Sequence, residues 1–367
     1  MKLAIVAGEA SGDLHAAEVV RELKALDPNL ETFGIGGDLL AREGMRLLHH
    51  AKEMGVIGLF NVLRQYPKFR KIFDDMVAAL SVEKPDGVML VDYPGFNLRL
   101  AKKCRELGLR VVYYISPQVW AWRQGRVKQI EKVVDRMIVL FPFEEEFYAK
   151  HRVPVTYAGH PLIDELAGVH RADAPPHEPL RIALLPGSRK SEVSALLPAM
   201  LDAVAVLQRE RAVDAWIVRA PTISSAELLD EMRRSDTIVR IEPHGAQAIA
   251  DADVALSSSG TATLECAVIG TPVIVMYRLS RATHWIARRV VVVPHFSLVN
   301  IVAGKKVVPE LLQHDVNGHR IAAEVREMSE PAAHARLRAE LAAVRDKLGG
   351  PGASRRAAEA IVSTLQA

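Results

Sequence analysis

Short runs of Val, Ile and Leu alternate with longer stretches of helical period along most of this chain. Residues 88–91 (Val-Met-Leu-Val) and 111–115 (Val-Val-Tyr-Tyr-Ile) are continuous apolar and aromatic runs, which is typical of strands that helices cover on both faces. Strands that alternate with helices in this way build parallel βαβ units. The sequence therefore predicts an α/β protein with doubly wound, Rossmann-like parallel sheets.

The alternation breaks once, at a polar and proline-rich stretch over residues 172–179. The 367 residues also exceed what one hydrophobic core usually supports. We therefore expect two Rossmann-like domains, 1–165 and 166–345, followed by a helical tail. A glycine-rich interruption at 349–352 divides that tail into two helices, and we expect the last one, about 352–367, to rejoin the first domain.

Composition excludes several classes of protein. The two cysteines, Cys104 and Cys266, lie far apart, so neither a disulfide framework nor a cysteine zinc site is available. The motif Asp251-Ala252-Asp253 precedes a predicted strand instead of following one, and we expect no metal and no other cofactor. A net charge of +3 is too small to indicate nucleic-acid binding. We expect a reducing compartment and no nucleic-acid partner.

The loop after the first predicted strand is acidic. Its sequence is Ala-Gly-Glu-Ala-Ser-Gly-Asp over residues 7–13, and its carboxylates would repel a phosphate from the following helix N-terminus. It also lacks the Walker lysine and the dinucleotide fingerprint. We predict that Glu9, Ser11 and Asp13 face a hydroxyl-bearing ligand, and we leave open the alternative that Glu9 and Asp13 cap and solubilise a helix start.

The loop that opens the second domain has the opposite charge. Gly187, Ser188 and Arg189 follow an apolar strand and begin a helix. Backbone N–H groups, a hydroxyl and a planar guanidinium together suit a diphosphate. The alternative is a solvated helix N-terminus, although cations at that end oppose the helix dipole.

A second loop of this kind follows the strand that ends near Ser257. Ser258 and Ser259 are small and keep the backbone accessible, and the N–H groups of Gly260 and Thr261 could face a second phosphate oxygen. Glu265 lies one helical turn further on and could accept two ribose hydroxyls. The two loops predict a nucleotide-diphosphate site in the second domain.

Asp92 follows the central strand over residues 87–91 and is our candidate general base. Sugar transfer to a hydroxyl needs a group that removes the acceptor proton and donors that stabilise the departing diphosphate. The alternative is that Asp92 caps the turn at 93–95. His160 is a second candidate at the domain junction, for which a packing role is equally acceptable. A nucleotide-sugar epimerase or hydrolase with the same donor site is the alternative function.

The complete set of motifs resembles the lipid-A-disaccharide synthase family from the first strand to about residue 313. The run Ser-Pro-Gln-Val-Trp-Ala-Trp-Arg at 116–123 is the most specific of them. The other motifs that carry the resemblance are 7–13, Met54-Gly55, 92–97 (Asp-Tyr-Pro-Gly-Phe-Asn), 141–144 (Phe-Pro-Phe-Glu), 159–161 (Gly-His-Pro), 184–192, 257–265 and 300–304 (Asn-Ile-Val-Ala-Gly).

This resemblance implies a glycosyltransferase of the GT-B architecture. It implies that UDP-2,3-diacylglucosamine and 2,3-diacylglucosamine 1-phosphate (lipid X) are joined through a β-1,6 linkage, with inversion, without a metal and with release of UDP. By the same resemblance Asp92 is the base, Trp120 lies on the acceptor side, and Arg189, Glu265 and Asn300 fall in motifs that hold UDP. One departure is Val299, where the family usually has Pro.

Acylated substrates imply contact with a membrane surface. No uninterrupted apolar stretch approaches the roughly 20 residues of a spanning helix, so we expect a cytoplasmic protein at the inner face of the membrane. Residues 54–71 combine apolar side chains with Arg and Lys, as interfacial segments do, and 284–292 is a second such segment. We favour the first segment as the acyl-chain site, with Val56, Ile57, Phe60 and Leu63 at the acyl chains. For each segment the alternative is an ordinary amphipathic helix packed on a sheet. The oligomeric state stays open, with a homodimer as one alternative.

Overall fold

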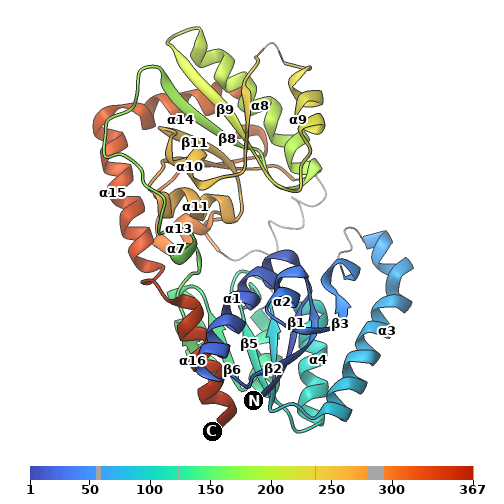
Figure 1. Ribbon diagram of the computed structural model, residues 1–367. Helices are drawn as coiled ribbons and strands as arrows, with labels where there is room; N and C mark the ends of the chain where they lie inside the picture. The colour runs from blue at the N-terminus through green and yellow to red at the C-terminus, as the bar shows by residue number, and fades with distance from the viewer. Residues whose placement is uncertain (55–58, 123, 236, 280–292, 367) are drawn as a thin grey trace. The chain divides into compact units, whose positions relative to one another are not determined.

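The computed structural model describes residues 1–54, 59–122, 124–235, 237–279 and 293–366, apart from the side chains of 59–66. The chain forms two compact units, which Figure 1 shows. The first consists of Met1–Pro161 together with Gly349–Ala367, and the second of Leu162–Leu348. The C-terminal helix therefore groups with the first unit, although the second unit precedes it in the chain.

The first unit is built on a seven-stranded parallel sheet in the order β3-β2-β1-β4-β5-β6-β7. Its strands are β1 (Lys2–Ala7), β2 (Glu31–Gly36), β3 (Arg46–His50), β4 (Gly87–Val91), β5 (Arg110–Tyr114), β6 (Arg136–Val139) and β7 (Val155–Tyr157). Its described helices are α1 (Ala10–Leu26), α2 (Asp38–Arg42), α3 (Leu59–Glu83), α4 (Pro94–Glu106), α5 (Val127–Val133), α6 (Pro142–Lys150) and α16 (Ala353–Gln366), with short 3₁₀ turns at Ala51–Glu53 and Gln124–Arg126.

The second unit is built on a six-stranded parallel sheet in the order β10-β9-β8-β11-β12-β13. Its strands are β8 (Leu180–Leu185), β9 (Val213–Arg219), β10 (Arg240–Pro243), β11 (Val254–Ser258), β12 (Val273–Tyr277) and β13 (Glu310–Leu312). Its described helices are α7 (Leu162–Glu165), α8 (Lys190–Gln208), α9 (Ser225–Met232), α10 (Ala246–Ala250), α11 (Thr261–Ile269), α13 (Leu298–Ala303), α14 (Gly318–Ser329) and α15 (Pro331–Lys347), with a 3₁₀ turn at Gln313–Asp315. The predicted doubly wound α/β class is confirmed.

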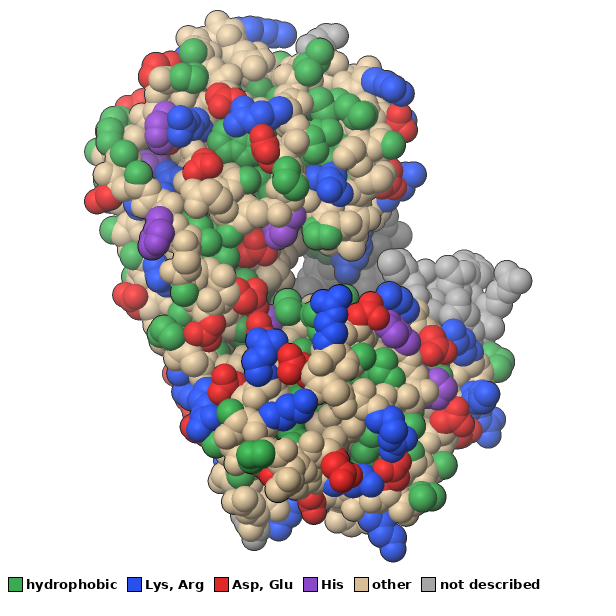
Figure 2. Space-filling model, in the orientation of Figure 1, with side chains coloured by type: hydrophobic (Ala, Val, Ile, Leu, Met, Phe, Trp, Pro, Cys, Tyr) green, Lys and Arg blue, Asp and Glu red, His purple; other side chains and the backbone are tan. Residues whose placement is uncertain are grey.

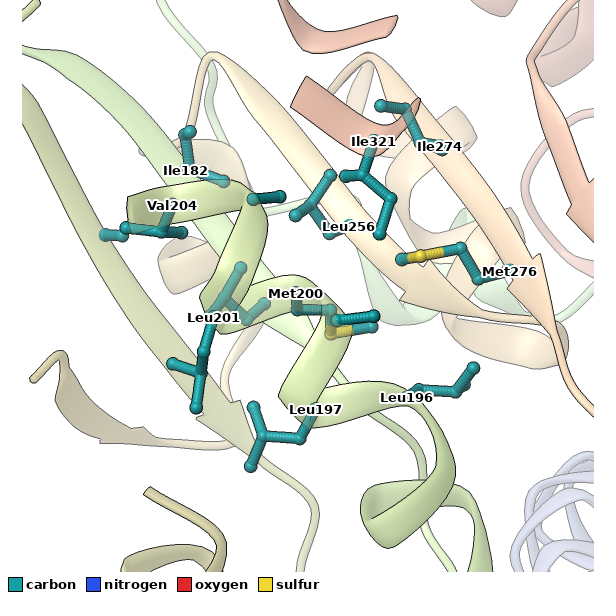
Figure 3. Packing of buried hydrophobic residues seen from close by; sticks show 14 of the residues in the cluster. Ile182, Leu196, Leu197, Met200, Leu201, Val204, Leu256, Ile274, Met276 and Ile321 are labelled. Carbon is teal, nitrogen blue, oxygen red and sulfur yellow. The ribbon is translucent and has the colours of Figure 1, made fainter. Parts of the chain in front are cut away.

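The core of the second unit forms where α8 packs on the central strands. Apolar residues of α8 recur at helical spacing and meet strand side chains and one residue of α14, as Figure 3 shows for Leu196, Leu197, Met200, Leu201, Val204, Ile182, Leu256, Ile274, Met276 and Ile321. Burial of each such side chain contributes about 1.5–3 kcal/mol. By length and composition α8 is also apolar enough to cross a membrane, but half of that window is buried inside the unit.

The C-terminal helix α16 completes the core of the first unit. Ala357, Ala358 and Ile361 belong to the same buried cluster as Leu3 and Ile5 of β1. Polar contacts fix the two ends of the helix. Arg110 Nη1 donates to the Thr364 carbonyl at 2.8 Å, and Arg356 Nε donates to the Ala158 carbonyl at 2.7 Å.

Each sheet has a point at which the strand order reverses. In the first unit the chain winds outward in one direction from β1 and in the other from β4, and in the second unit the same holds for β8 and β11. Ligands of open parallel sheets bind beyond the carboxyl ends of the strands at such points. The loops after β1, β4, β8 and β11 are therefore where each unit is expected to bind its ligand.

Candidate functional site

Asp92 lies immediately after β4 in a left-handed backbone conformation. Its φ is +42° and that of Tyr93 is +46°, and such positions cost of order 1–3 kcal/mol unless the surroundings enforce them. The Asp92 N–H donates to the Tyr114 carbonyl at 3.0 Å. The Asp92 carbonyl accepts Asn97 Nδ2 at 2.8 Å and the Tyr113 hydroxyl. These contacts fix the turn. The carboxylate itself accepts a backbone hydrogen bond from the adjacent Tyr93 N–H.

The surroundings of Asp92 favour its protonated form. Burial, followed by the negative charge of Glu9, raises the pKa of the Asp92 carboxyl to about 6. Desolvation disfavours the charged form, and a neighbouring carboxylate adds to the effect. A carboxylate with a pKa close to the working pH combines a populated basic form with appreciable proton affinity, which is what a general base needs.

Asp92 lines a cavity of about 720 Å³ in the first unit. One wall is aromatic, with Phe73 packed edge-on against Phe96 at 5.4 Å between ring centroids. Cationic groups lie on the same lining at Arg70 and Arg99. The remaining lining residues are Glu9, Phe69, Asp74, Tyr93, Pro94 and Gly95. The lining thus combines three carboxylates, an apolar wall and two guanidiniums.

The loop after β1 closely approaches the turn after β4. A Cβ on Gly8 would lie 2.9 Å from the Tyr93 ring, so a larger residue would displace the ring. The Tyr93 hydroxyl donates to the Met54 carbonyl at 3.0 Å. Gly8 therefore positions the loop after β1 directly against the turn that carries Asp92.

The acidic loop after β1 divides into two roles. Glu9 is exposed at the N-cap position of α1, makes no side-chain cap hydrogen bond and lines the cavity. Ser11 is exposed in the first turn of the same helix. Asp13 is 4% exposed and its carboxylate accepts the N–H groups of Gly37, Leu39 and Leu40 at 2.6, 3.0 and 3.2 Å. Asp13 thus caps the start of α2. The alternative of helix capping therefore holds for Asp13, although at α2 and not at its own helix. Its position does not by itself indicate a contact with the acceptor.

Trp120 is placed inside the first unit. Its side chain is 7% exposed, and its indole Nε1 donates to Glu144 Oε1 at 3.0 Å. Glu144 is buried, and burial raises the pKa of its carboxyl to about 7. The indole thus connects its loop to α6, and the acceptor-side role of Trp120 stays a prediction.

His160 is also buried, and burial, with the charge of His15, lowers the pKa of its imidazole to about 3. Its ring packs against Phe141 at 5.3 Å. These contacts support the packing role that the sequence left open. Of the predicted acyl-chain residues, Val56 and Ile57 lie outside the described residues, as does the segment 284–292, and Phe60 and Leu63 lie on α3 in the part whose side chains are not described.

In the second unit the predicted diphosphate loop joins β8 to α8. Gly187 has a φ of +121°, and a Cβ there would lie 2.4 Å from Glu192 Oε2. That oxygen accepts the N–H groups of Ser188 at 3.0 Å and of Arg189 at 3.3 Å. Arg189 Nη1 donates to Glu192 Oε1 at 3.0 Å. A carboxylate thus occupies the anion-binding end of α8, which shows that this end binds negative charge.

The loop between β11 and α11 lies beside it, because β11 and β8 are hydrogen-bonded neighbours. Ser258 ends β11, and the Ser259 hydroxyl donates to the Phe296 carbonyl at 3.3 Å. Gly260 and Thr261 are exposed at the start of α11, and a Cβ on Gly260 would meet nothing within 4 Å. The start of α11 is therefore open to a ligand on the same sheet edge as Ser188.

Glu265 lies one turn further along α11. Burial raises the pKa of its carboxyl, against the effect of His244, whose Nε2 lies 3.8 Å from Glu265 Oε2. Sequence reasoning did not single out His244, because a lone histidine after a short strand carries no pattern. Nor did it single out Phe73 and Arg99, whose contribution depends on how α3 and α4 meet.

Asn300 lies on α13, and its role toward UDP stays a prediction. Its side chain is fully buried. Its Oδ1 accepts the N–H groups of Val307 and Val308 at 2.7 and 2.9 Å, and its Nδ2 donates to the Val308 carbonyl at 3.0 Å. Asn300 thus holds the loop after α13, and all its hydrogen-bonding groups serve that loop. Val299 is likewise fully buried.

A family model described as lipid-A-disaccharide synthetase matches residues 3–361. The lipid-A-disaccharide synthase of Myxococcus xanthus (strain DK1622) is 41% identical over 378 residues, which are 99% of this chain and 97% of the relative. That of Syntrophus aciditrophicus (strain SB) is 43% identical over 373 residues, which are 96% of this chain and 95% of the relative.

Solved structures with a similar backbone include a UDP-N-acetylglucosamine 2-epimerase from Listeria monocytogenes and the glycotransferase of kitacinnamycin. The first has a TM-score of 0.66 at 14% identity and covers 100% of this chain and 96% of its own. The second has a TM-score of 0.65 at 16% identity and covers 99% and 98%. Likeness at this identity shows the fold, and it confirms the predicted GT-B architecture.

Proposed function

The chain belongs to the lipid-A-disaccharide synthase family of UDP-sugar-dependent glycosyltransferases, and we propose that it transfers 2,3-diacylglucosamine from UDP to lipid X with Asp92 as the base. The single observation that carries the assignment of the base is the placement of Asp92. It stands at the end of β4, partly buried, beside Glu9, and on the lining of a cavity with an aromatic wall. Of the other two carboxylates on that lining, Glu9 is exposed after β1 and Asp74 lies on α3.

The proposed reaction transfers one proton to the base and one electron pair to the leaving group. The Asp92 carboxylate removes the proton from the 6-hydroxyl of the acceptor, and the acceptor oxygen forms a bond to C1 of the donor sugar. The bond between C1 and the diphosphate breaks, and its electron pair leaves with UDP. Attack from the face opposite the leaving group inverts the configuration and gives the β-1,6 linkage. Asp92 then returns its proton to solvent.

The second unit supplies the stabilisation of the departing diphosphate. The N–H groups at the start of α8, the guanidinium of Arg189 and the open start of α11 carry partial or full positive charge on one sheet edge. Such fixed donors stabilise negative charge that develops on a leaving group. Glu265 is available for the ribose hydroxyls. Ser258, Ser259 and Gly187 shape the two loops.

The cavity of the first unit matches the chemistry of the acceptor. Lipid X carries acyl chains and a phosphate, and the lining combines Phe69, Phe73 and Phe96 with Arg70 and Arg99. We assign the aromatic wall to an acyl chain and Arg99 to the phosphate, since a guanidinium pairs well with phosphate oxygens.

The acylated substrates place the enzyme at the cytoplasmic face of the inner membrane, where the segment 54–71 contacts lipid.

The membrane contact has its own test. Replacement of Phe60 and Leu63 by Ser is expected to reduce sedimentation with anionic liposomes, because an interfacial segment binds through its apolar residues. Unchanged sedimentation would show that another part of the chain contacts lipid.

Asp92→Asn tests the base directly. Transfer is expected to fall by about 10²–10⁴-fold, the usual contribution of a general base, while UDP affinity is retained because the donor loops lie in the other unit. Near-wild-type transfer would exclude Asp92 as the base. A loss of both transfer and UDP binding would indicate a structural effect instead.

The likeness to UDP-N-acetylglucosamine 2-epimerases keeps one alternative function in view. An epimerase or hydrolase would convert UDP-2,3-diacylglucosamine without an acceptor. Release of UDP that requires lipid X supports transfer, and release at the same rate without lipid X would support the alternative.

A further inference from the structure

The second unit contains a hollow of about 820 Å³ away from the donor loops. It is lined by the segment 169–175, by the C-terminal end of α11 and by one face of α15. The donor loop contacts the other end of α11, and a nine-residue helix is about 13 Å long. The hollow is therefore separate from the proposed UDP site.

Three arginines line this hollow, and we call it the arginine groove. Arg171 comes from the segment before β8, and Arg338 and Arg345 come from α15, where a spacing of seven residues puts them on one face. Ala335, Ala339 and Ala342 lie between them on the lining and leave the hollow open. The arrangement directs guanidiniums from two separate segments toward the same space.

The charge of the arginine groove is not balanced by its own lining. Asp173 is the one carboxylate among the described lining residues. It pairs with Arg338 Nη1 at 2.6 Å, and its side chain is 98% exposed. Burial, followed by the positive charge of Arg338, lowers the pKa of Arg171 to about 10. The charges of Asp253 and Asp251 act on that pKa in the opposite direction. The groove lining itself holds three guanidiniums and one solvated carboxylate.

Two of the arginines also hold donors that have no partner. The Nε atoms of Arg171 and Arg338 are buried, and neither has a hydrogen-bond partner among the described residues. Arg171 Nη1 is occupied by the carbonyls of Ala250 and Ala252 after α10, the first at 2.7 Å. The two carbonyls thus accept from Nη1 of Arg171, and Asp173 accepts from Nη1 of Arg338. Neither contact involves the Nε groups. An unmade bond to a buried charged donor costs about 1–3 kcal/mol or more.

We propose that the arginine groove binds a phosphate-bearing anion, held by Arg171, Arg338 and Arg345. A phosphate presents several acceptor oxygens and accepts paired N–H groups from a guanidinium. It would neutralise the positive charge that the groove lining leaves uncompensated. The apolar lining at Val169, Val268 and Ile269 can accommodate the non-phosphate part of such a molecule. The site does not depend on the proposed transferase reaction.

Titration calorimetry with pyrophosphate tests this site in the full-length protein. Saturating UDP is present throughout, so that the donor loops are occupied. We expect wild-type protein to bind pyrophosphate, and Arg338→Gln and Arg345→Gln each to weaken binding by about tenfold, which is the loss of one charge-assisted contact. Arg336→Gln is the matched control, because Arg336 is exposed on the same helix and outside the groove lining.

A second arm distinguishes the source of the phosphate. Flotation with mixed phosphatidylcholine and phosphatidylglycerol vesicles is compared between Arg345→Gln and Arg336→Gln. Loss of vesicle binding specific to Arg345→Gln assigns the groove to a lipid headgroup, and loss of pyrophosphate binding alone assigns it to a soluble phosphate compound.

The proposal is overturned if wild-type protein does not bind pyrophosphate and Arg345→Gln floats with vesicles as the wild type does. It is also overturned if Arg336→Gln weakens binding as much as Arg345→Gln, because the effect would then be one of net charge. Should Arg338→Gln fail to fold, Arg345→Gln decides, since Arg345 is exposed.

Discussion

Glu192 Oε2 accepts the backbone N–H of Ser188 at 3.0 Å, so a carboxylate of the chain itself occupies the helix end that we assign to the UDP diphosphate. The same carboxylate accepts the N–H of Arg189 and pairs with its guanidinium. Bound UDP must therefore share these donors with Glu192 or displace it. The two anions compete for the same positive end of α8.

Glu192→Gln is expected to tighten UDP binding. The amide oxygen can still accept one N–H, but the negative charge that opposes the diphosphate is gone, and about 1 kcal/mol of removed repulsion corresponds to roughly a fivefold gain in affinity. Calorimetry with UDP measures it. Glu227→Gln is the control, because Glu227 completes the same kind of capping box on α9. Weaker UDP binding in Glu192→Gln would mean that the carboxylate organises the loop for the ligand.

The described charged residues are mixed over the surface, and Figure 2 shows Lys and Arg interspersed with Asp and Glu on the face in view. Sequence could predict this balance from a net charge of +3. It could also predict the central strands, because β4 is buried along its whole length and β5 from Val111 on, and both carry apolar and aromatic runs there. The edge strands β3 and β13 were missed, since Arg-Leu-Leu-His-His and Glu-Leu-Leu are short and half-buried.

Side-chain roles were less predictable than loop positions. Strand pattern located the loops after β4, β8 and β11, and those loops carry Asp92, Ser188 and Gly260. It could not show that Asp13 caps α2 or that Asn300 serves the backbone of 307–308, since both partners lie in other segments. Contacts of this kind depend on the packed tertiary structure.

Transfer should lose activity on the acid side with an apparent pKa close to 6. The Asp92 carboxyl has a pKa raised to about 6, and the base acts in its deprotonated form. The rate is therefore full above this pKa and falls as the pH drops through it. A profile of kcat/KM against pH measures it. An acidic limb near 4 would show that the pKa of the titrating carboxyl is not raised in the free enzyme.

Glu9→Gln should shift that acidic limb to lower pH. The charge of Glu9 is the second cause of the raised pKa of Asp92, after burial, so its removal lowers the pKa in part. Asp74→Asn is the control, since Asp74 lines the same cavity but is not among the causes of the shift. An equal shift in both variants would indicate a general field effect.

Arg99→Gln should raise the KM for lipid X while leaving kcat and UDP affinity close to wild type. The loss of one phosphate contact is expected to raise the KM for lipid X about tenfold. An acceptor without the 1-phosphate should show no difference between the variant and the wild type. Lys102→Gln, an exposed substitution on the same helix outside the cavity, is the matched control. A rise in KM that persists with the dephosphorylated acceptor would exclude a phosphate contact.

Glu144 makes the stability of the first unit depend on pH. Burial raises the pKa of its carboxyl to about 7, above the value of about 4.3 expected in the unfolded chain. The folded state therefore binds a proton that the unfolded state has released. The stabilisation is fully present below the unfolded pKa and is lost as the pH rises through about 7, by up to about 4 kcal/mol.

Glu144→Gln should remove this dependence on pH. Glu144 Oε1 accepts the Trp120 indole N–H at 3.0 Å and Oε2 accepts the Phe141 N–H at 3.2 Å. An amide leaves one of these donors facing an NH₂ group, which costs about 1–3 kcal/mol at all pH values. Urea unfolding over a pH series, followed by tryptophan fluorescence, measures both effects. Glu146→Gln, exposed on the same helix, should keep the wild-type slope, and an unchanged slope in Glu144→Gln would assign the proton uptake to another group.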